Sequence, residues 1–258
     1  MPSEPFFRRD GATFVPTDIC RGPWDPNSLH GRVVAGLLAY EIERHVDDSD
    51  FLPSRLTVDL YRMPPFAPVT VRATTERRGN RIRIVDAEFR SGDVSIGRAS
   101  CLLLRRSENP EGNVWRPAPW NVPAPDALPV PPNQGEREPM WDSRVIDHGF
   151  GAVARKNSWL RENRLLIEAE PLTPFLRAAI SADFTNPFAN SGDQGLQFVN
   201  ADITLYLHRM PVGDWLGYQV TAHHATDGVA IGECTIYDLD GAIGTSTVCG
   251  VAQKKRVS

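Results

Sequence analysis

The sequence predicts an α+β fold that occurs twice in the chain. The main observation is an internal repeat, in which residues 56–104 match residues 203–251 without a gap, at a constant offset of 147 positions. The run Arg62-Met63-Pro64 returns as Arg209-Met210-Pro211. In each copy a helix-like segment precedes several strand-like segments, an order typical of α+β domains. Because a repeat determines the architecture of a whole chain, we predict two structurally equivalent halves.

The predicted strands of each copy are separated by short turns. Segments rich in β-branched residues predict antiparallel strands at 55–61, 69–77, 81–90 and 94–105 in the first copy. The corresponding segments of the second copy are 201–208, 216–224, 229–239 and 242–252. Glycine-containing turns, such as Ser91-Gly92-Asp93, separate neighbouring strands and favour hairpins.

A helix is predicted before the strands of the first copy. Residues 28–45 carry apolar side chains at i, i+3 and i+4 spacing, which is the pattern of a helix with one face on a sheet. Asn27 or Ser28 is available as its N-cap.

A second helix is predicted at residues 172–184, before the strands of the second copy. Thr173 is a candidate N-cap, and Pro174 takes the first helical position, where a missing N–H is tolerated. The later Pro187 is expected to oppose continuation of this helix. Each half is therefore expected to be one helix packed against an antiparallel sheet.

A proline-rich connector separates the two copies. The predicted division is an N-terminal domain at 1–106, the connector at 107–143 and a C-terminal domain at 144–258. Such a segment is typically extended and semi-rigid, and its tryptophans are expected to hold it against the domains. They are Trp115, Trp120 and Trp141. The alternative is a docking site for a module that binds proline-rich segments.

The composition argues against several classes of protein. A hydrophobic fraction of 41% and a charged fraction of 23% are ordinary for a globular chain. The net charge of -4 gives no general attraction to nucleic acid, and the basic tail at 254–256 is too short to change that. No apolar run has the length of a signal peptide or a membrane span, so we expect a cytoplasmic protein.

The four cysteines show no spacing typical of a metal site. They are Cys20, Cys101, Cys234 and Cys249, and we expect them to be reduced and buried as small apolar residues. No metal and no cofactor is predicted.

Several short motifs resemble those of the double hotdog thioesterases. In the first half they are Gly22-Pro23-Trp24-Asp25 and His30-Gly31, before an apolar helix. In the second half Ala182-Asp183-Phe184, Asn200-Ala201-Asp202-Ile203, His208-Arg209-Met210-Pro211 and Trp215 follow the order and spacing of that family. The chain outside the connector thus resembles the acyl-CoA thioesterase II type. This resemblance implies a tandem double hotdog fold, in which each half is one central helix wrapped by an antiparallel sheet.

The resemblance also implies a catalytic set. The family is expected to hydrolyse an acyl-CoA without a metal or a covalent intermediate, using one water among an Asp, a Thr or Ser, and a Gln. Asp183 matches the Asp and is expected to act as general base. Asn200 falls on the Thr or Ser position and Cys249 on or beside the Gln position, so both depart from the pattern. An amide can orient a water, whereas a thiol is a weak hydrogen-bond partner, and the alternative for Cys249 is a core-facing strand residue.

His30, Gly31 and Gly36 are the candidate substrate-binding residues. His30 and Gly31 lie at the start of the first predicted helix, where free backbone N–H groups can polarise a thioester carbonyl. Gly36 corresponds to Asp183 at the offset of 147, so only one of the two equivalent sites carries the carboxylate.

The predicted function is an acyl-CoA thioesterase of lipid and fatty acid metabolism that releases free acid and coenzyme A. Arg62 and Arg209 are candidates either for the phosphates of coenzyme A or for structural ion pairs across the sheet. The departures at Asn200 and Cys249 keep open a second function, a weak or silent acyl-CoA-binding protein. A hotdog enoyl-CoA hydratase or dehydratase is a third and less favoured alternative. Acyl-CoA is the expected partner, and sheet pairing between identical chains is an expected route to a homo-oligomer.

Overall fold

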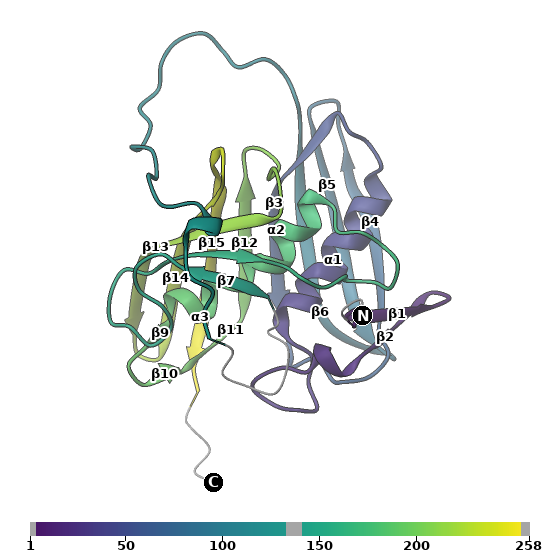
Figure 1. Ribbon diagram of the computed structural model, residues 1–258. Coiled ribbons are helices and arrows are strands. Elements are labelled where there is room, and N and C mark those ends of the chain that lie inside the picture. Colours follow the sequence, from purple (N-terminus) through teal and green to yellow (C-terminus); the bar gives the residue numbers. More distant parts are fainter. Residues whose placement is uncertain (1–3, 133–140, 254–258) are drawn as a thin grey trace.

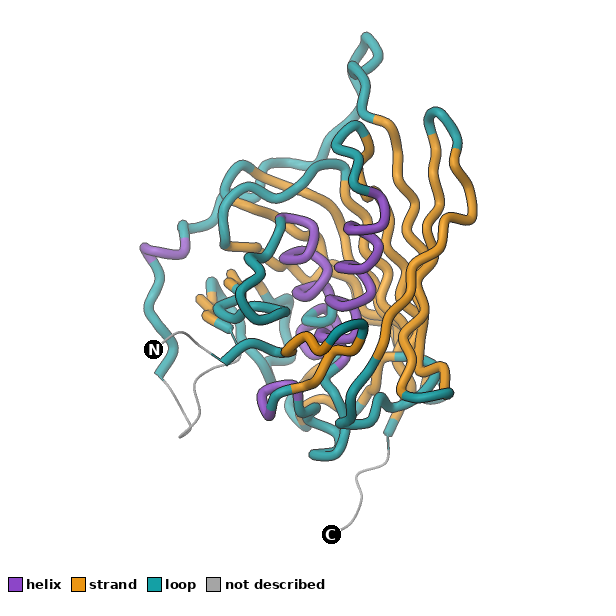
Figure 2. The backbone as a smooth tube through the Cα atoms, turned by 90° about the vertical axis from the view of Figure 1, so that its right-hand side faces the viewer, coloured by secondary structure: helices purple, strands orange, loops and turns teal. Residues whose placement is uncertain are grey.

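The computed structural model describes residues 4–132 and 141–253. Within these residues eleven strands form one antiparallel sheet. Figures 1 and 2 show that this sheet curves around the helices, which lie together on its concave face. The basic tail at 254–256 and part of the predicted connector lie outside the described residues.

The first half consists of one long helix and four strands. Helix α1 spans Gly31–Val46, and the strands follow one another across the sheet as β4 (Thr70–Arg78), β5 (Ile82–Ser91), β6 (Val94–Arg105) and β3 (Phe51–Leu60). All four were predicted, although β3 begins before its predicted start at Arg55. Its first part contains Pro53, next to a shift in register against β6. A proline in a strand has no N–H for the ladder, which fits its place at an irregularity.

The second half repeats this plan with additional short strands. Its helices are α2 (Pro174–Ala182) and α3 (Thr185–Ala189), and its strands continue the sheet in the order β12 (Asp202–Leu207), β15 (Gly241–Ala252), β14 (Val229–Asp238), β13 (Trp215–Thr226), β8 (Asn157–Arg161) and β7 (Asp142–Val145). Strand β11 (Phe198–Asn200) also pairs with β15. The prediction missed β7, β8 and β11, because such short strands have too few residues to show a period.

Smaller elements lie outside this sheet. The described residues contain two hairpins, β1 (Phe7–Asp10) with β2 (Thr13–Pro16) and β9 (Ser191–Gly192) with β10 (Gly195–Leu196). They also contain the 3-10 helices η1 (Asp18–Cys20) and η2 (Pro125–Ala127). The chain before β1 runs against the second half, because the N–H of Phe6 donates to the carbonyl of Leu165.

Strands β3 and β12 join the two halves. They are antiparallel, and Thr57 lies opposite Thr204, the residue 147 positions later in the chain. Leu56 lies opposite Leu205, and the remaining pairs continue in this register. A local two-fold axis therefore passes between Thr57 and Thr204, so the repeat in the sequence is also a repeat in the structure.

Helices α1 and α2 pack against each other inside the sheet. A β-carbon on Gly36 of α1 would lie 2.8 Å from Cγ1 of Ile180 and 3.0 Å from a methyl group of Leu166. Gly36 therefore lets the two helices approach closely. Helix α1 also packs against β4, β5 and β6 of the sheet, and its residues Leu37 and Leu38 are fully buried.

The helix ends differ in part from the prediction. Thr173 is the N-cap of α2 as predicted, and its Oγ1 accepts a hydrogen bond from the N–H of Leu176. The N-cap of α1 is His30, so the prediction of Asn27 or Ser28 was wrong. Pro187 does not prevent a helix, because it lies in the first turn of α3, where an N–H has no intrahelical acceptor.

The tryptophans of the connector behave differently from one another. Trp120 stacks on Tyr237 with ring centroids 4.2 Å apart, and Trp141 packs edge-on against Phe184. The expectation that the tryptophans hold the connector against the domains is confirmed for these two. It is wrong for Trp115, which is 84% exposed. Figure 1 shows that the chain after β6 arches away from the sheet before it returns.

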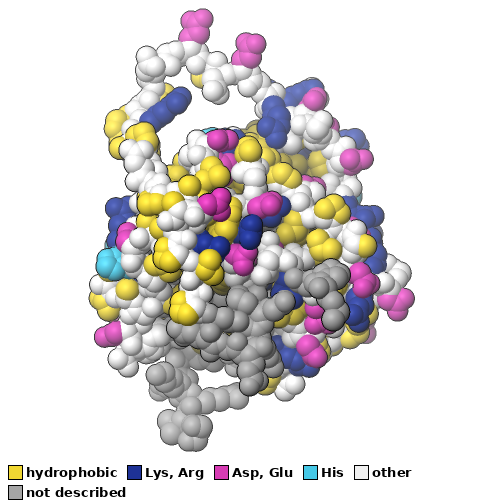
Figure 3. Space-filling model, in the orientation of Figure 1, with side chains coloured by type: hydrophobic (Ala, Val, Ile, Leu, Met, Phe, Trp, Pro, Cys, Tyr) yellow, Lys and Arg dark blue, Asp and Glu magenta, His cyan; other side chains and the backbone are white. Residues whose placement is uncertain are grey.

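Several surface properties complete the description. In Figure 3, basic and acidic side chains are interspersed over the visible face. No helix in the described ranges is long and apolar enough to cross a membrane. Cys20, Cys101 and Cys234 are buried as expected, whereas Cys249 is exposed, so both the expected burial and the core-facing alternative were wrong for it.

Candidate active site

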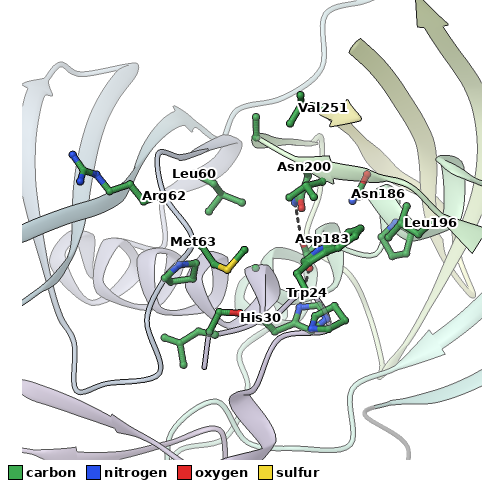
Figure 4. A pocket seen from close by; sticks show the side chains of 18 of the residues that line it. Trp24, His30, Leu60, Arg62, Met63, Asp183, Asn186, Leu196, Asn200 and Val251 are labelled. Atoms are coloured by element: carbon green, nitrogen blue, oxygen red, sulfur yellow. Dashed lines mark hydrogen bonds and ion pairs between the residues drawn. The ribbon is translucent and has the colours of Figure 1, made fainter. Parts of the chain in front are cut away.

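A cavity of about 440 Å³ lies between the two halves (Figure 4). The first half contributes the loop before α1 and the chain at the end of β3, and the second half contributes α3, β11 and the end of β15. The described lining residues are Pro23, Trp24, Ser28, Leu29, His30, Gly31, Leu60, Tyr61, Arg62, Met63, Pro64, Trp141, Phe150, Asp183, Asn186, Pro187, Leu196, Val199, Asn200, Ala201 and Val251. Most of them are apolar and a few are polar, a combination typical of a small-molecule site.

Asp183 lies at the junction of α2 and α3 and is only 4% exposed. Nδ2 of Asn200 donates a hydrogen bond of 2.8 Å to Oδ1 of Asp183, and Nδ1 of His30 lies 3.1 Å from Oδ2. Figure 4 shows the two partners reaching this carboxylate from opposite sides. A buried carboxylate is costly without such partners, and the nearby N-terminus of α1 also favours its negative charge.

The last turn of α2 is fixed to the sheet, which positions Asp183. The hydroxyl of Tyr218 in β13 donates to Oγ of Ser181 at 2.8 Å, and Oγ of Ser246 in β15 donates to the carbonyl of Ala182 at 3.2 Å. Phe184 then packs edge-on against Tyr218. The backbone on both sides of Asp183 is therefore held by buried contacts.

His30 connects the start of α1 to the carboxylate. Its Nδ1 lies 3.3 Å from the N–H of Arg32, as expected for an N-cap, and 3.1 Å from Oδ2 of Asp183. One ring nitrogen cannot accept from Arg32 and donate to Asp183 at the same time. The protonation of Nδ1 therefore decides which of the two contacts is a hydrogen bond.

Gly31 is the first residue of α1, so its N–H has no acceptor within the helix. A β-carbon on Gly31 would lie 2.9 Å from Oδ1 of Asp183. Glycine therefore allows the carboxylate to lie directly against the helix start.

Arg32 is fully buried and is not part of the cavity lining. It pairs with Glu162 at 3.0 Å, and its guanidinium lies over the rings of Phe6 and Trp141. Burial lowers the pKa of Arg32 and raises that of Glu162. The large side chain at this position is therefore directed away from the cavity and leaves the helix start open to it.

Asn186 of the cavity lining and its partner Asn190 were not predicted from the sequence. Nδ2 of Asn186 donates to the carbonyl of Phe198 in β11 at 3.0 Å, and Nδ2 of Asn190 donates to Oδ1 of Asn186 at 2.9 Å. Nδ1 of His223 lies 2.7 Å from Oδ1 of Asn190, and burial lowers the pKa of His223. This chain of contacts fastens β11, which carries Asn200, to α3. The i, i+4 spacing of the asparagines was an available signal.

The structure does not bring Cys249 and Gly36 to the cavity. Asn200 lies opposite Gly250 in the β11–β15 pair, so Cys249 points to the other face of the sheet. Cys249 is exposed. Partial desolvation of its thiol and the negative charge of nearby Asp202 raise its pKa. His30, Gly31, Asp183 and Asn200 are the predicted site residues that the structure brings together.

Two protein-family models match the chain. Residues 20–104 match the N-terminal domain of acyl-CoA thioesterases, and residues 118–249 match the C-terminal domain. No curated protein matches the chain at a significant level.

Solved structures share the fold at low sequence identity. A structure described as a putative thioesterase, from Novosphingobium aromaticivorans, is 17% identical with a TM-score of 0.74, and the alignment covers 98% of this chain and 100% of that one. The tesB protein of Mycobacterium avium subs paratuberculosis is 17% identical with a TM-score of 0.70, covering 96% of both chains. The acyl-CoA thioesterase II TesB2 of Mycobacterium marinum is 17% identical with a TM-score of 0.67, also covering 96% of both.

These matches confirm the tandem double hotdog fold predicted from the sequence. They also follow the internal repeat, because the N-terminal family domain falls on the first copy and the C-terminal domain contains nearly all of the second. The chain therefore belongs to the acyl-CoA thioesterase family and is a hydrolase that acts on thioester bonds.

Proposed function

We propose that the protein hydrolyses an acyl-CoA with a water molecule activated by Asp183. The observation that carries this proposal is the buried carboxylate on the cavity wall, held by Asn200 and His30. A carboxylate in this setting can accept the proton of a water as its oxygen attacks a carbonyl carbon. The apolar remainder of the lining suits an acyl chain.

Asn200 and Gly31 have the supporting roles in this proposal. Nδ2 of Asn200 is engaged by Asp183, which leaves its carbonyl oxygen to accept a hydrogen bond from the attacking water. The N–H of Gly31 at the start of α1 stabilises the oxyanion that forms on the thioester carbonyl. With Nδ1 protonated, His30 donates to Oδ2 of Asp183, while each carboxylate oxygen keeps a lone pair for the water.

The reaction balances without a metal or a covalent intermediate. Water adds to the carbonyl carbon while its proton passes to Asp183, which gives a tetrahedral oxyanion beside Gly31. The C–S bond then breaks, and the departing sulfur receives the proton from Asp183. The products are a free acid and coenzyme A, and the carboxylate returns to its starting state. Cys249 and Gly36 take no part in these steps.

A reducing compartment is consistent with the cysteines, because all four are free thiols. We infer a cytoplasmic protein from these thiols, and a role in lipid metabolism from the acyl-CoA thioesterase domains. Association of identical chains through the sheet remains a prediction.

Thiol release from acyl-CoAs of increasing chain length tests this proposal. Wild-type protein should release thiol, and Asp183→Ala should abolish the release while thermal unfolding shows an intact fold. Asp193→Ala is the matched control, because Asp193 is an exposed acid outside the cavity lining. Wild-type rates in Asp183→Ala would overturn the assignment of the base.

A silent acyl-CoA-binding protein is the first alternative. The observation in its favour is that Cys249, which falls on or beside the Gln position of the family, is not among the described lining residues. Binding of a nonhydrolysable thioether analogue of acyl-CoA, without thiol release from any acyl-CoA, would support this alternative.

An enoyl-CoA hydratase or dehydratase is the second alternative. The observation in its favour is the proximity of His30 and Asp183, an acid–base pair that comes from two different halves. Loss of the ultraviolet absorbance of a crotonyl thioester, without release of thiol, would support it.

A further inference from the structure

Arg62 and Arg209 occupy equivalent positions in the repeat but have different surroundings. Nη1 of Arg209 donates to Oδ2 of Asp238 at 2.5 Å, and Nη2 donates to Oδ1 at 2.6 Å. Nη2 also donates to the carbonyl of Gly241 at 3.0 Å. The side chain of Asp238 is fully buried. Such a bidentate pair fixes the arginine, so Arg209 has the structural role that was one of its two predicted alternatives.

The first copy has no carboxylate at this place. The equivalent of Asp238 is Ser91, which lies at the same point of its hairpin, since Ser91 pairs with Val94 as Asp238 pairs with Gly241. Arg62 is exposed and makes no hydrogen bond or ion pair through its side chain with any residue that the structure describes. The repeat has therefore kept the arginine in both copies, but only the second copy holds it with an internal acid.

Arg62 lies at the rim of the candidate active site. It is the only Lys or Arg among the described lining residues. Figure 4 shows Arg62 beyond Leu60 and Met63 as seen from Asp183, with its guanidinium directed away from the carboxylate. Its neighbours Tyr61 and Met63 are about half exposed and also line the cavity. A ligand that enters past Met63 would place its outer end near this cation.

We propose that Arg62 binds the phosphate of a phosphopantetheine arm and thereby positions the thioester. This inference rests on the proposed function, since it assumes an acyl group in the cavity and a thioester at Asp183. The arm would then run outward past Met63 toward the guanidinium. An arginine without an internal acid is available for a phosphate, and its planar fork matches the oxygens of that group. Coenzyme A and acyl carrier protein both present this phosphate.

Kinetics with matched thioesters of one acyl chain test the role of Arg62. The substrates are acyl-CoA, acyl-phosphopantetheine, which ends at the phosphate, and acyl-pantetheine, which lacks both this phosphate and the adenine nucleotide. Arg62→Gln should raise KM for acyl-CoA about tenfold, with a smaller effect on kcat, since hydrogen bonds to charged groups have about this magnitude. The preference of this variant for acyl-CoA over acyl-pantetheine should fall by the same factor. Its kcat/KM for acyl-CoA should also depend less on salt concentration than that of wild type.

Arg72→Gln is the control, because Arg72 is an exposed arginine of β4 outside the cavity lining. It should keep the wild-type preference. A carrier-protein thioester, compared with acyl-CoA, shows which source of the phosphate the site uses. The inference is overturned if Arg62→Gln changes the kinetics of acyl-phosphopantetheine and acyl-pantetheine equally or changes neither.

Equilibrium binding separates this inference from the proposed function. Calorimetry with coenzyme A and with pantetheine requires no turnover. If Arg62→Gln binds coenzyme A more weakly than wild type does but binds pantetheine equally well, the inference is supported. This holds even if no thioester is hydrolysed, in which case only the proposed function fails. Equal binding of coenzyme A to wild type and variant overturns the inference even if hydrolysis is observed.

Discussion

Gly31 lies directly against Asp183, so that a β-carbon on Gly31 would come within 2.9 Å of Oδ1. The start of α1 in the first half and the carboxylate of the second half thus form one site only because residue 31 has no side chain. This contact joins the proposed oxyanion donor to the proposed base.

Gly31→Ala should therefore damage catalysis more than stability. The added methyl group displaces the carboxylate, and a shift of this size can lower the rate roughly 10²-fold. The measurement is kcat/KM for thiol release, together with the melting temperature. Gly149→Ala is the control, because its β-carbon would meet only Val145 at ordinary contact distance. Wild-type kcat/KM in Gly31→Ala would contradict the proposed geometry.

Asn200→Ala should lower kcat about 10- to 100-fold, because the carboxylate loses a hydrogen bond and the water loses its acceptor. Asn200→Thr, which restores the residue type expected from the family, should recover part of this loss. Single-turnover rates measure both variants, and Asn113→Ala in the exposed connector serves as the control. Equal rates in Asn200→Ala and wild type would remove Asn200 from the mechanism.

Asp238→Asn should destabilise the fold in a pH-dependent way. Burial tends to raise the pKa of Asp238, but the hydrogen bonds from Arg209 and from two backbone N–H groups lower it below the ordinary 3.8. A lowered pKa contributes stability that is present above the unfolded pKa and is lost as the pH falls through the folded one. Breaking a buried pair costs about 3–5 kcal/mol, so the loss should be near that size at pH 7.

Urea unfolding at several pH values measures this effect. The difference between wild type and Asp238→Asn should shrink as the pH falls below about 4. Arg62→Gln is the matched control, since the equivalent arginine has no carboxylate partner and its loss should not change stability. A difference that stays constant with pH would mean that Asp238 is not charged in the folded protein.

Gly36→Ala tests whether Gly36 contributes to packing or to substrate binding. The added methyl group would meet Ile180 between α1 and α2, and overpacking of this kind costs about 1–3 kcal/mol. We expect a lower free energy of unfolding with an unchanged KM. A raised KM with an unchanged free energy of unfolding would show that Gly36 contributes to substrate binding.

The long elements of the fold could be predicted from the sequence. The helix period of residues 28–45 and the β-branched segments of each copy identified α1 and the eight long strands. The offset of 147 made Thr57 and Thr204 equivalent positions of the repeat, but their pairing across β3 and β12 was not predicted. Helix α2 ends before Pro187, but the short helix α3 was not predicted, because Pro187 lies in its first turn, where a proline is tolerated.

The site was harder to predict than the fold, because its contacts join distant segments. No local pattern shows that His30 of the first half lies beside Asp183 of the second. Cys249 shows a further limit, since a shift of one residue along a strand moves a side chain to the opposite face. Its neighbour Gly250, and not Cys249, lies opposite Asn200.

The central claim is that the carboxylate of Asp183 performs the chemistry and does not merely hold the ligand. Asp183→Asn keeps the shape of the side chain and removes the base, so thiol release and binding of a thioether analogue of acyl-CoA should be measured on the same protein. We predict near wild-type affinity for the analogue and loss of thiol release. Thiol release at the wild-type rate would contradict the account.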